Sequence, residues 1–320
     1  MMKITAFGAS GSIPAPSRSN FMRMEYGGNT SCYFVEAGPF RVILDFGSGS
    51  AVLGDHMMTM LKGKPASYIG LISHQHWDHI QGMPFMVPMF VPGNVFHLHG
   101  HIPPSRQVPS LKQDLETLLA EQQATPKFPV ALSAMGSERY YNEHQAQSSS
   151  TFYYRYNMDG AYTKVGGVNW KDGGTDPNLI KITTIPLNHP DGCLGYLIEY
   201  MGKKIAYCTD NEPFRFTNHR INTIAAGADL LIADGQYTEQ QLQTGAQGFG
   251  HGSPMACLYQ ALDAKAKRLL VHHFDQKNDD EALGDMEMDM LTKYLEYKDH
   301  KNQGVLAEVG FVREGMVYEV

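Results

Sequence analysis

The chain contains 320 residues, of which 42% are hydrophobic and 18% are charged. These fractions are close to those of ordinary globular proteins, so they exclude disordered, collagen-like and coiled-coil classes. A formal net charge of −7 disfavours a broad electrostatic surface for nucleic acid. No segment has the roughly 18 consecutive apolar residues of a membrane-spanning helix, and residues 1–8 lead into a glycine turn instead of an apolar signal core. We therefore expect a cytoplasmic protein with no membrane partner.

The first predicted elements are strands. Residues 31–47, rich in aromatic and β-branched side chains around a Gly-Pro turn, predict a β-hairpin. Three later apolar runs predict buried strands with a polar residue after each strand. They are residues 68–73, 204–209 and 229–233, and they precede His74, Asp210 and Asp234.

Helices are predicted between these strands. Leucines at 111, 115, 118 and 119 share one helical face and predict a helix over 110–123. Ser253-Pro254 is typical of a capped helix start and predicts a helix that continues to Lys267. The segment 142–177 contains Gln/Ser-rich and Gly/Asp-rich patches, so we interpret it as an excursion with hairpin character.

Residues 73–82 form the most informative segment, Ser-His-Gln-His-Trp-Asp-His-Ile-Gln-Gly, which contains an HxHxDH string. In an extended chain His74 and His76 project from one face, and a turn after Trp77 can bring Asp78 and His79 toward a neighbouring point. A surface cluster of unrelated polar residues is a poor explanation for three imidazoles and a carboxylate at this spacing. Two adjacent metal ions could share these four side chains.

Further candidate ligands follow later in the chain. Each has a structural alternative: a loop histidine, a helix-capping aspartate, a polar residue before a helix, or a core histidine. They are His189, Asp210, His251 and the pair His272-His273. The aspartate could bridge two cations, because a carboxylate has two oxygens.

Two other groups of side chains are predicted to be structural. The four cysteines are scattered without a CxxC pair, so they predict neither a disulfide framework nor a thiolate zinc site. His97, His99 and His101 alternate along one predicted strand, but no carboxylate follows them at ligand spacing. A third metal site is therefore not predicted.

The HxHxDH string, followed at long intervals by His, Asp and His, resembles the signature of the metallo-β-lactamase fold hydrolases. Further segments resemble the phosphodiesterase branch, which contains tRNase Z and relatives that act on cyclic nucleotides. These segments are Gly8-Ala-Ser-Gly-Ser-Ile-Pro, Tyr26-Gly-Gly-Asn-Thr-Ser, Asn188-His-Pro-Asp-Gly, Thr209-Asp-Asn-Glu-Pro and Gly250-His-Gly-Ser. The resemblance implies an α/β fold, a four-layer αββα sandwich, in a single domain over 1–320. A variable substrate-side excursion is expected at residues 100–178.

The resemblance also implies a dinuclear metal site. One ion would be held by His74, His76 and His189, the other by Asp78, His79 and a late histidine, with Asp210 between them. Neighbouring strand residues face opposite sides, so only one of the late pair can easily be a ligand. The family pattern falls on His273 and leaves His272 as a packing residue. This nitrogen and oxygen ligand set suits zinc, which we expect, and also manganese or iron.

The implied activity is hydrolysis of a phosphodiester, with Asp78 and His251 as catalytic residues. His251 would act near the scissile phosphate, and Asp78 would orient the attacking water. The acidic charge balance and the missing basic arm favour a small-molecule substrate over long nucleic acid. We therefore expect 3′,5′-cyclic AMP or GMP first. The base could stack on Phe85, Tyr153, Tyr154 or Tyr156.

Other functions stay open on the sequence alone. A tRNA 3′-end processing endonuclease is the main alternative, followed by a thioester hydrolase or lactonase of the same fold. A non-enzymatic binding module is disfavoured because every expected ligand position is filled. A homodimer, common among the relatives, also stays open.

Overall fold

The computed structural model describes residues 1–103, 114–168, 170, 174–214, 217–301 and 306–320. Within this part of the chain, the strands form two large sheets. The first has the order β15 (Val317–Glu319), β1 (Met2–Gly8), β2 (Cys32–Ala37), β3 (Phe40–Leu44), β4 (Ser67–Leu71), β5 (Val95–His101) and β6 (Glu138–His144). The second has the order β14 (Glu308–Phe311), β13 (Arg268–His272), β12 (Leu230–Asp234), β11 (Lys203–Cys208), β10 (Cys193–Tyr200), β9 (Leu179–Leu187), β7 (Thr151–Tyr156) and β8 (Tyr162–Val165).

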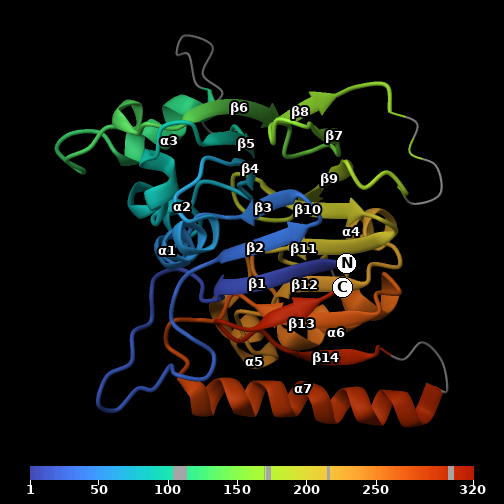
Figure 1. Ribbon diagram of the computed structural model, residues 1–320. Helices are drawn as coiled ribbons and strands as arrows, with labels where there is room; N and C mark the ends of the chain where they lie inside the picture. Colours follow the sequence, from blue (N-terminus) through green and yellow to red (C-terminus); the bar gives the residue numbers. More distant parts are fainter. Residues whose placement is uncertain (104–113, 169, 171–173, 215–216, 302–305) are drawn as a thin grey trace.

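Each sheet combines an antiparallel part with a parallel part. In the first sheet β3, β4, β5 and β6 run parallel, and in the second β11, β12, β13 and β14 do so. The antiparallel hairpin of β2 and β3 confirms the prediction for residues 31–47. β1 pairs with β15, so the two ends of the chain lie side by side (Figure 1).

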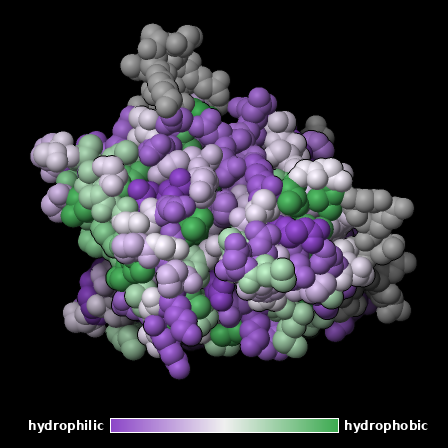
Figure 2. Space-filling view, turned by 45° about the horizontal axis from the view of Figure 1, so that its top comes forward, coloured by the Kyte–Doolittle hydropathy of each residue, from purple (hydrophilic) through white to green (hydrophobic). Residues whose placement is uncertain are grey.

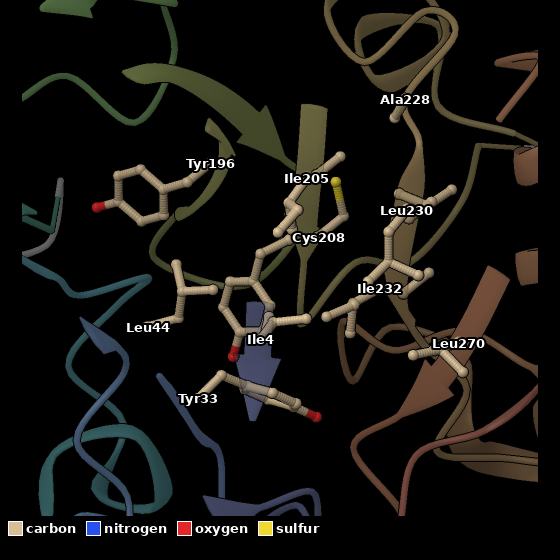
Figure 3. Close-up of a cluster of buried hydrophobic side chains, with 14 of the residues drawn as sticks. Ile4, Tyr33, Leu44, Tyr196, Ile205, Cys208, Ala228, Leu230, Ile232 and Leu270 are labelled. Atoms are coloured by element: carbon tan, nitrogen blue, oxygen red, sulfur yellow. The ribbon is translucent and has the colours of Figure 1, made fainter. Parts of the chain in front are cut away.

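The two sheets pack face to face through a continuous hydrophobic core. Ile4, Tyr33 and Leu44 from the first sheet meet side chains such as Tyr196 and Ile205 from the second (Figure 3). All of these side chains are buried. Burial of apolar surface at roughly 25 cal/mol per Å² makes this inter-sheet layer the main source of fold stability.

Helices and short helical turns are the other elements of the fold. The helices are α1 (Gly49–Leu61), α2 (Trp77–Ile80), α3 (Leu115–Gln122), α4 (His219–Ile224), α5 (Glu239–Gln241), α6 (Pro254–Asp263) and α7 (Asp280–Lys301). The 3₁₀ turns are η1 (Met83–Phe85), η2 (Val87–Phe90) and η4 (Leu132–Ala134), and a π-helical turn, η5 (Leu242–Ala246), follows α5. α1 packs on β1 and β2, whereas α6 packs on β12 and β13. This arrangement is the predicted αββα sandwich.

The predicted helices form with different bounds. Asp114 caps α3 by accepting a hydrogen bond from the Thr117 N–H, so the helix begins at Leu115; residues 110–113 lie outside the described part. The Ser253 side chain caps α6 as predicted, but the helix ends at Asp263, before Lys267. Ala264 and Lys265 then turn the chain toward β13, because Lys265 has the positive φ of 53° that ends a helix.

The segment 100–178, which is expected to be an excursion, contributes strands to both sheets within its described residues. β6 lies at one edge of the first sheet, and the β7–β8 hairpin forms one edge of the second. The hairpin character predicted for 142–177 is therefore confirmed. On the face shown in Figure 2, hydrophobic residues are scattered among hydrophilic ones. No helix within the described residues is both long and apolar enough to cross a membrane.

Candidate metal centre

The predicted ligands converge where strands of both sheets end. His74 follows β4, Asp210 follows β11 and His273 follows β13, so they come from the carboxyl ends of parallel strands. Such ends are common positions for sites in α/β proteins. Asp210 and His273 have positive φ angles of 33° and 65°. This backbone conformation costs of order 1–3 kcal/mol in non-glycine residues and turns the chain abruptly out of each strand.

One group of side chains surrounds the Oδ2 atom of Asp210. His74 Nε2 lies 3.5 Å from this oxygen, and His189 Nε2 lies 3.7 Å from it. His76 Nδ1 lies 3.1 Å from His189 Nε2. His74, His76, His189 and Asp210 each present one ligand atom within 4.8 Å of the others. This group could hold one metal ion.

A second group surrounds the other oxygen of the same carboxylate. His79 Nε2 and His273 Nε2 each lie 3.2 Å from Asp210 Oδ1. Asp78 Oδ2 lies 3.3 Å from His79 Nε2 and 3.1 Å from His273 Nε2. Asp78, His79 and His273 could hold a second ion, and Asp210 turns one oxygen toward each group. All seven predicted ligands are thus brought together.

Burial sets the charge state of the first histidine group. It lowers the pKa values of His74, His76 and His189, which keeps their imidazoles neutral. A neutral imidazole has a lone pair on one ring nitrogen, which is the form that ligates metals. These three side chains therefore carry the protonation state that metal binding needs.

Nearby carboxylates determine the charge state of His79 in the second group. Burial disfavours a charged His79, but the carboxylates of Asp210, Asp78 and Asp45 outweigh burial and raise the His79 pKa. Burial of Asp210 is similarly outweighed by His273, His79 and His74, which lower the pKa of its carboxyl group. The buried carboxylates thus stabilise positive charge in this group, and bound cations would supply such charge.

The donor set fits divalent metal ions. Every candidate ligand atom is an imidazole nitrogen or a carboxylate oxygen. His74 Nε2 is buried and has no hydrogen-bond partner, although it lies within the cluster. A buried polar atom without a partner is costly, and a metal ion would satisfy it.

Several residues that orient the ligands were not identified from the sequence. Asp45 accepts hydrogen bonds from His79 Nδ1 at 2.8 Å and from the hydroxyls of Ser73 and Tyr207. Gln236 Oε1 lies 3.2 Å from His273 Nδ1. Such contacts fix the tautomer and ring orientation of a ligand histidine. Asp45 directly follows a hydrophobic strand, and this position is the sequence signal from which it could have been identified.

The loop before His251 supports His189. The Gly250 carbonyl lies 2.9 Å from His189 Nδ1, and the Glu212 carboxylate accepts hydrogen bonds from the N–H groups of Gly248 and Gly250. Gly250 has a φ of 92°, and a Cβ atom there would lie 2.2 Å from His189 Nδ1. Only glycine fits this close approach.

His251 lies beside the cluster and is oriented by Asp234. Its Nδ1 atom is 3.0 Å from Asp234 Oδ2 and 3.9 Å from Asp210 Oδ2. Burial would lower the His251 pKa, but Asp234 outweighs burial and raises it to about 9. Because Nδ1 faces Asp234, Nε2 is the atom that could donate a proton to a substrate. Asp234, the last residue of β12, therefore supports the site through His251.

The neighbouring late histidines occupy different environments. His273 lies in the cluster, whereas His272 packs against Tyr33 and Tyr207 with ring centroids 5.6 and 5.3 Å apart. We expect His273→Ala to lose one metal ion per chain and His272→Ala to keep both while lowering the melting temperature. Elemental analysis and thermal unfolding of the two variants test this. Loss of metal from the His272 variant alone would contradict the assignment.

The structure corrects one of the aromatic predictions, that for Tyr154, and leaves His97, His99 and His101 outside the candidate ligand groups. Tyr154 is buried, and its hydroxyl lies 2.9 Å from His99 Nε2; Tyr156 packs against Phe40. The Tyr154 ring is taken up by core packing and cannot stack on a substrate, whereas the Tyr156 ring is half-buried. Within the described residues, no group of candidate ligands includes His97, His99 or His101. The four cysteines are free and buried, as predicted.

The chain matches the family model of the β-lactamase superfamily domain over residues 62–274. It therefore belongs to the β-lactamase superfamily, whose members are mostly metal-dependent hydrolases, and it has the metallo-β-lactamase fold. The predicted resemblance and fold class are confirmed. No curated protein matches the sequence.

Solved structures of the same fold cover nearly the whole chain. The metallo-β-lactamase fold protein YhfI from Bacillus subtilis has 20% identity and a TM-score of 0.60, over 100% of this chain and 99% of that chain. The short form of human tRNase Z has 16% identity and a TM-score of 0.58, over 99% of each chain. A diphosphatase of the PhnP family has 14% identity and a TM-score of 0.57, over 100% and 98%. At these identities the likeness concerns the fold.

Proposed function

We propose that the protein is a dinuclear metal-dependent phosphodiesterase that hydrolyses a small phosphodiester, with 3′,5′-cyclic AMP or GMP as the first candidates. The observation that carries this proposal is the position of Asp210. Its two oxygens face two separate groups of candidate ligands, 3.5 Å from His74 Nε2 on one side and 3.2 Å from His79 Nε2 on the other. This is the arrangement that a bridging carboxylate requires.

The proposed ligands follow from these groups. One ion would be held by His74, His76 and His189, the other by Asp78, His79 and His273, and both by Asp210. We propose zinc, because a nitrogen-rich set with carboxylates suits it. Bound divalent ions would supply Lewis-acid stabilisation of the phosphoryl oxygens and a more acidic water.

The residues of the chain would position the reacting groups. Asp78 Oδ2 accepts a hydrogen bond from the Ser12 N–H at 2.7 Å, which holds this carboxylate in one orientation to align the water. His251 would donate its Nε2 proton to the leaving oxygen, while Asp234 stabilises the charged ring. The water, having given up one proton to solvent, would form the new P–O bond as the bond from phosphorus to the leaving oxygen breaks. The leaving oxygen takes the His251 proton, and the ring recovers a proton from solvent.

The choice of a small substrate rests on charge. The net charge of −7 opposes binding to a polyanion, because affinity for long RNA grows with the number of phosphates that Lys and Arg neutralise. A cyclic diester has a single phosphate and needs few such contacts. The tRNA 3′-end endonuclease stays the alternative, since human tRNase Z shares the fold over 99% of its chain.

A substrate screen tests the proposal. We expect the metal-loaded protein to hydrolyse bis(p-nitrophenyl) phosphate and cyclic AMP or cyclic GMP with weak salt dependence, and to leave precursor tRNA and a thioester intact at physiological salt. Product formation is measured by chromatography between about 50 and 200 mM salt, with a chelator-treated sample as control. Efficient, salt-sensitive cleavage of tRNA with inert cyclic nucleotides would support the endonuclease instead.

A further inference from the structure

A cleft of about 650 Å³ opens directly beside the first ligand group. His74 and His76 line it, and the rest of its wall comes from α2 with its flanking residues, η1, the end of β5, α3, the segment after α3 and the turn after His189. The volume is in the range of small-ligand sites. A substrate whose phosphate sits at the metal cluster would extend one of its arms into this cleft.

Aromatic rings form much of the exposed wall. Trp77 is 77% exposed and Phe85 is 60% exposed, although both are large and hydrophobic. Phe128 also lines the cleft, with its ring centroid 5.4 Å from that of Phe85 and an interplanar angle of 88°. Trp77 separates two candidate ligands, His76 and Asp78, so the aromatic wall begins next to the cluster. Exposed aromatic surface grouped in one cavity is typical of a binding site for a flat, partly apolar group.

Three polar side chains of the wall have buried atoms without hydrogen-bond partners. They are Gln75 Oε1, Gln122 Nε2 and both ring nitrogens of His101. His101 is fully buried, and its ring lies near the backbone of Ile102 and Gly192 without the geometry of a hydrogen bond. Together these atoms include donors and acceptors, which is the mixture that the edge of a heterocycle presents.

The charges around the cleft argue against a second anionic group. Lys127 is the cationic side chain among the lining residues, and the carboxylates of Glu121 and Asp191 accompany it. An additional phosphate would meet more negative than positive charge there. A neutral ring avoids this repulsion and still uses the aromatic wall and the polar atoms.

We propose that this cleft is a nucleobase pocket, in which the base of the substrate contacts Trp77, Phe85 and Phe128 and hydrogen-bonds with Gln75, His101 and Gln122. The inference rests on the proposed phosphodiesterase function, because that function places a nucleotide phosphate at the metal cluster. It assigns base recognition to side chains within residues 75–101 and 122–128 instead of the tyrosines of β7. Among the aromatic residues predicted for this role, it retains Phe85.

Binding experiments can test the pocket without catalysis. The sequence has two tryptophans, so Trp170→Phe leaves Trp77 as the single fluorescent indole. We expect AMP to quench Trp77 emission in the metal-loaded protein and to bind at least tenfold more tightly than ribose 5-phosphate, which lacks the base. Affinities come from fluorescence titration and calorimetry.

A matched pair of variants locates the base. Phe85→Ala in the Trp170→Phe background should weaken AMP binding about tenfold and leave ribose 5-phosphate binding unchanged. Phe214→Ala is the control, because Phe214 is 76% exposed and lies outside the cleft. Circular dichroism checks that both variants are folded. Because both rings are exposed, we expect their removal to leave the core intact.

The outcomes separate this inference from the proposed function. Equal affinity for AMP and ribose 5-phosphate, or equal weakening by the two alanine variants, would overturn the nucleobase pocket. If bis(p-nitrophenyl) phosphate is still hydrolysed, the phosphodiesterase proposal survives that result. If AMP binds as expected but no phosphodiester is cleaved, the pocket is supported and the catalytic proposal fails.

Discussion

The Asp210→Ala variant is expected to lose at least one of two bound metal ions per chain and at least about 100-fold in phosphodiesterase activity. Asp210 is 1% exposed, and its oxygens lie 3.2 Å from His273 Nε2 and 3.5 Å from His74 Nε2. Removing the carboxylate would leave two cations facing each other with no shared anion between them. Elemental analysis of metal content per chain, alongside turnover of bis(p-nitrophenyl) phosphate, measures both effects.

Asp229→Ala provides the matched control. Asp229 is also a buried aspartate next to a strand of the second sheet, but its carboxylate binds the Lys204 N–H and Lys267 Nζ, away from the cluster. We expect this variant to lose some stability and to keep both metal ions. A fully metallated and fully active Asp210→Ala protein would refute the shared-ligand assignment.

The His251→Ala variant is expected to keep both metal ions and to lose roughly 100-fold or more in turnover of a substrate with a poor leaving group, such as cyclic AMP. The reason is that, in the proposed mechanism, His251 Nε2 supplies the proton of the leaving alkoxide. With p-nitrophenolate as leaving group protonation matters little, so the loss should shrink. Turnover numbers for both substrates, measured with wild-type and variant protein, give the comparison.

Two other outcomes would change the role of His251. An equal loss with good and poor leaving groups would indicate that the side chain binds the phosphate. A loss of metal would indicate ligation instead, which the geometry also allows, because His251 forms a third group of candidate ligand atoms with Asp210 and His273. Asp234→Asn should reproduce part of the His251→Ala effect, since Asp234 orients and charges the ring.

Tyr154 shows where sequence reasoning failed. It lies on β7 with Tyr153 and Tyr156, and successive residues of a strand face opposite sides. The sequence could not indicate that the inner face packs on the core, because β7 is paired with β9, residues 179–187. The aromatic wall beside the metal cluster instead contains Phe128, to which no local pattern pointed.

The candidate ligands followed from local sequence patterns, and the fold class followed from the family resemblance that these patterns carry. The spacing of His74, His76, Asp78 and His79 within six residues is a covalent property of the chain, and strand alternation together with the family pattern selected His273 over His272. Local spacing carries this information because neighbouring residues cannot separate in space. Contacts between distant segments have no such constraint. Asp45 meets His79, Gly250 meets His189, and Gln122 meets the cleft only because two sheets pack face to face and bring the strand ends together.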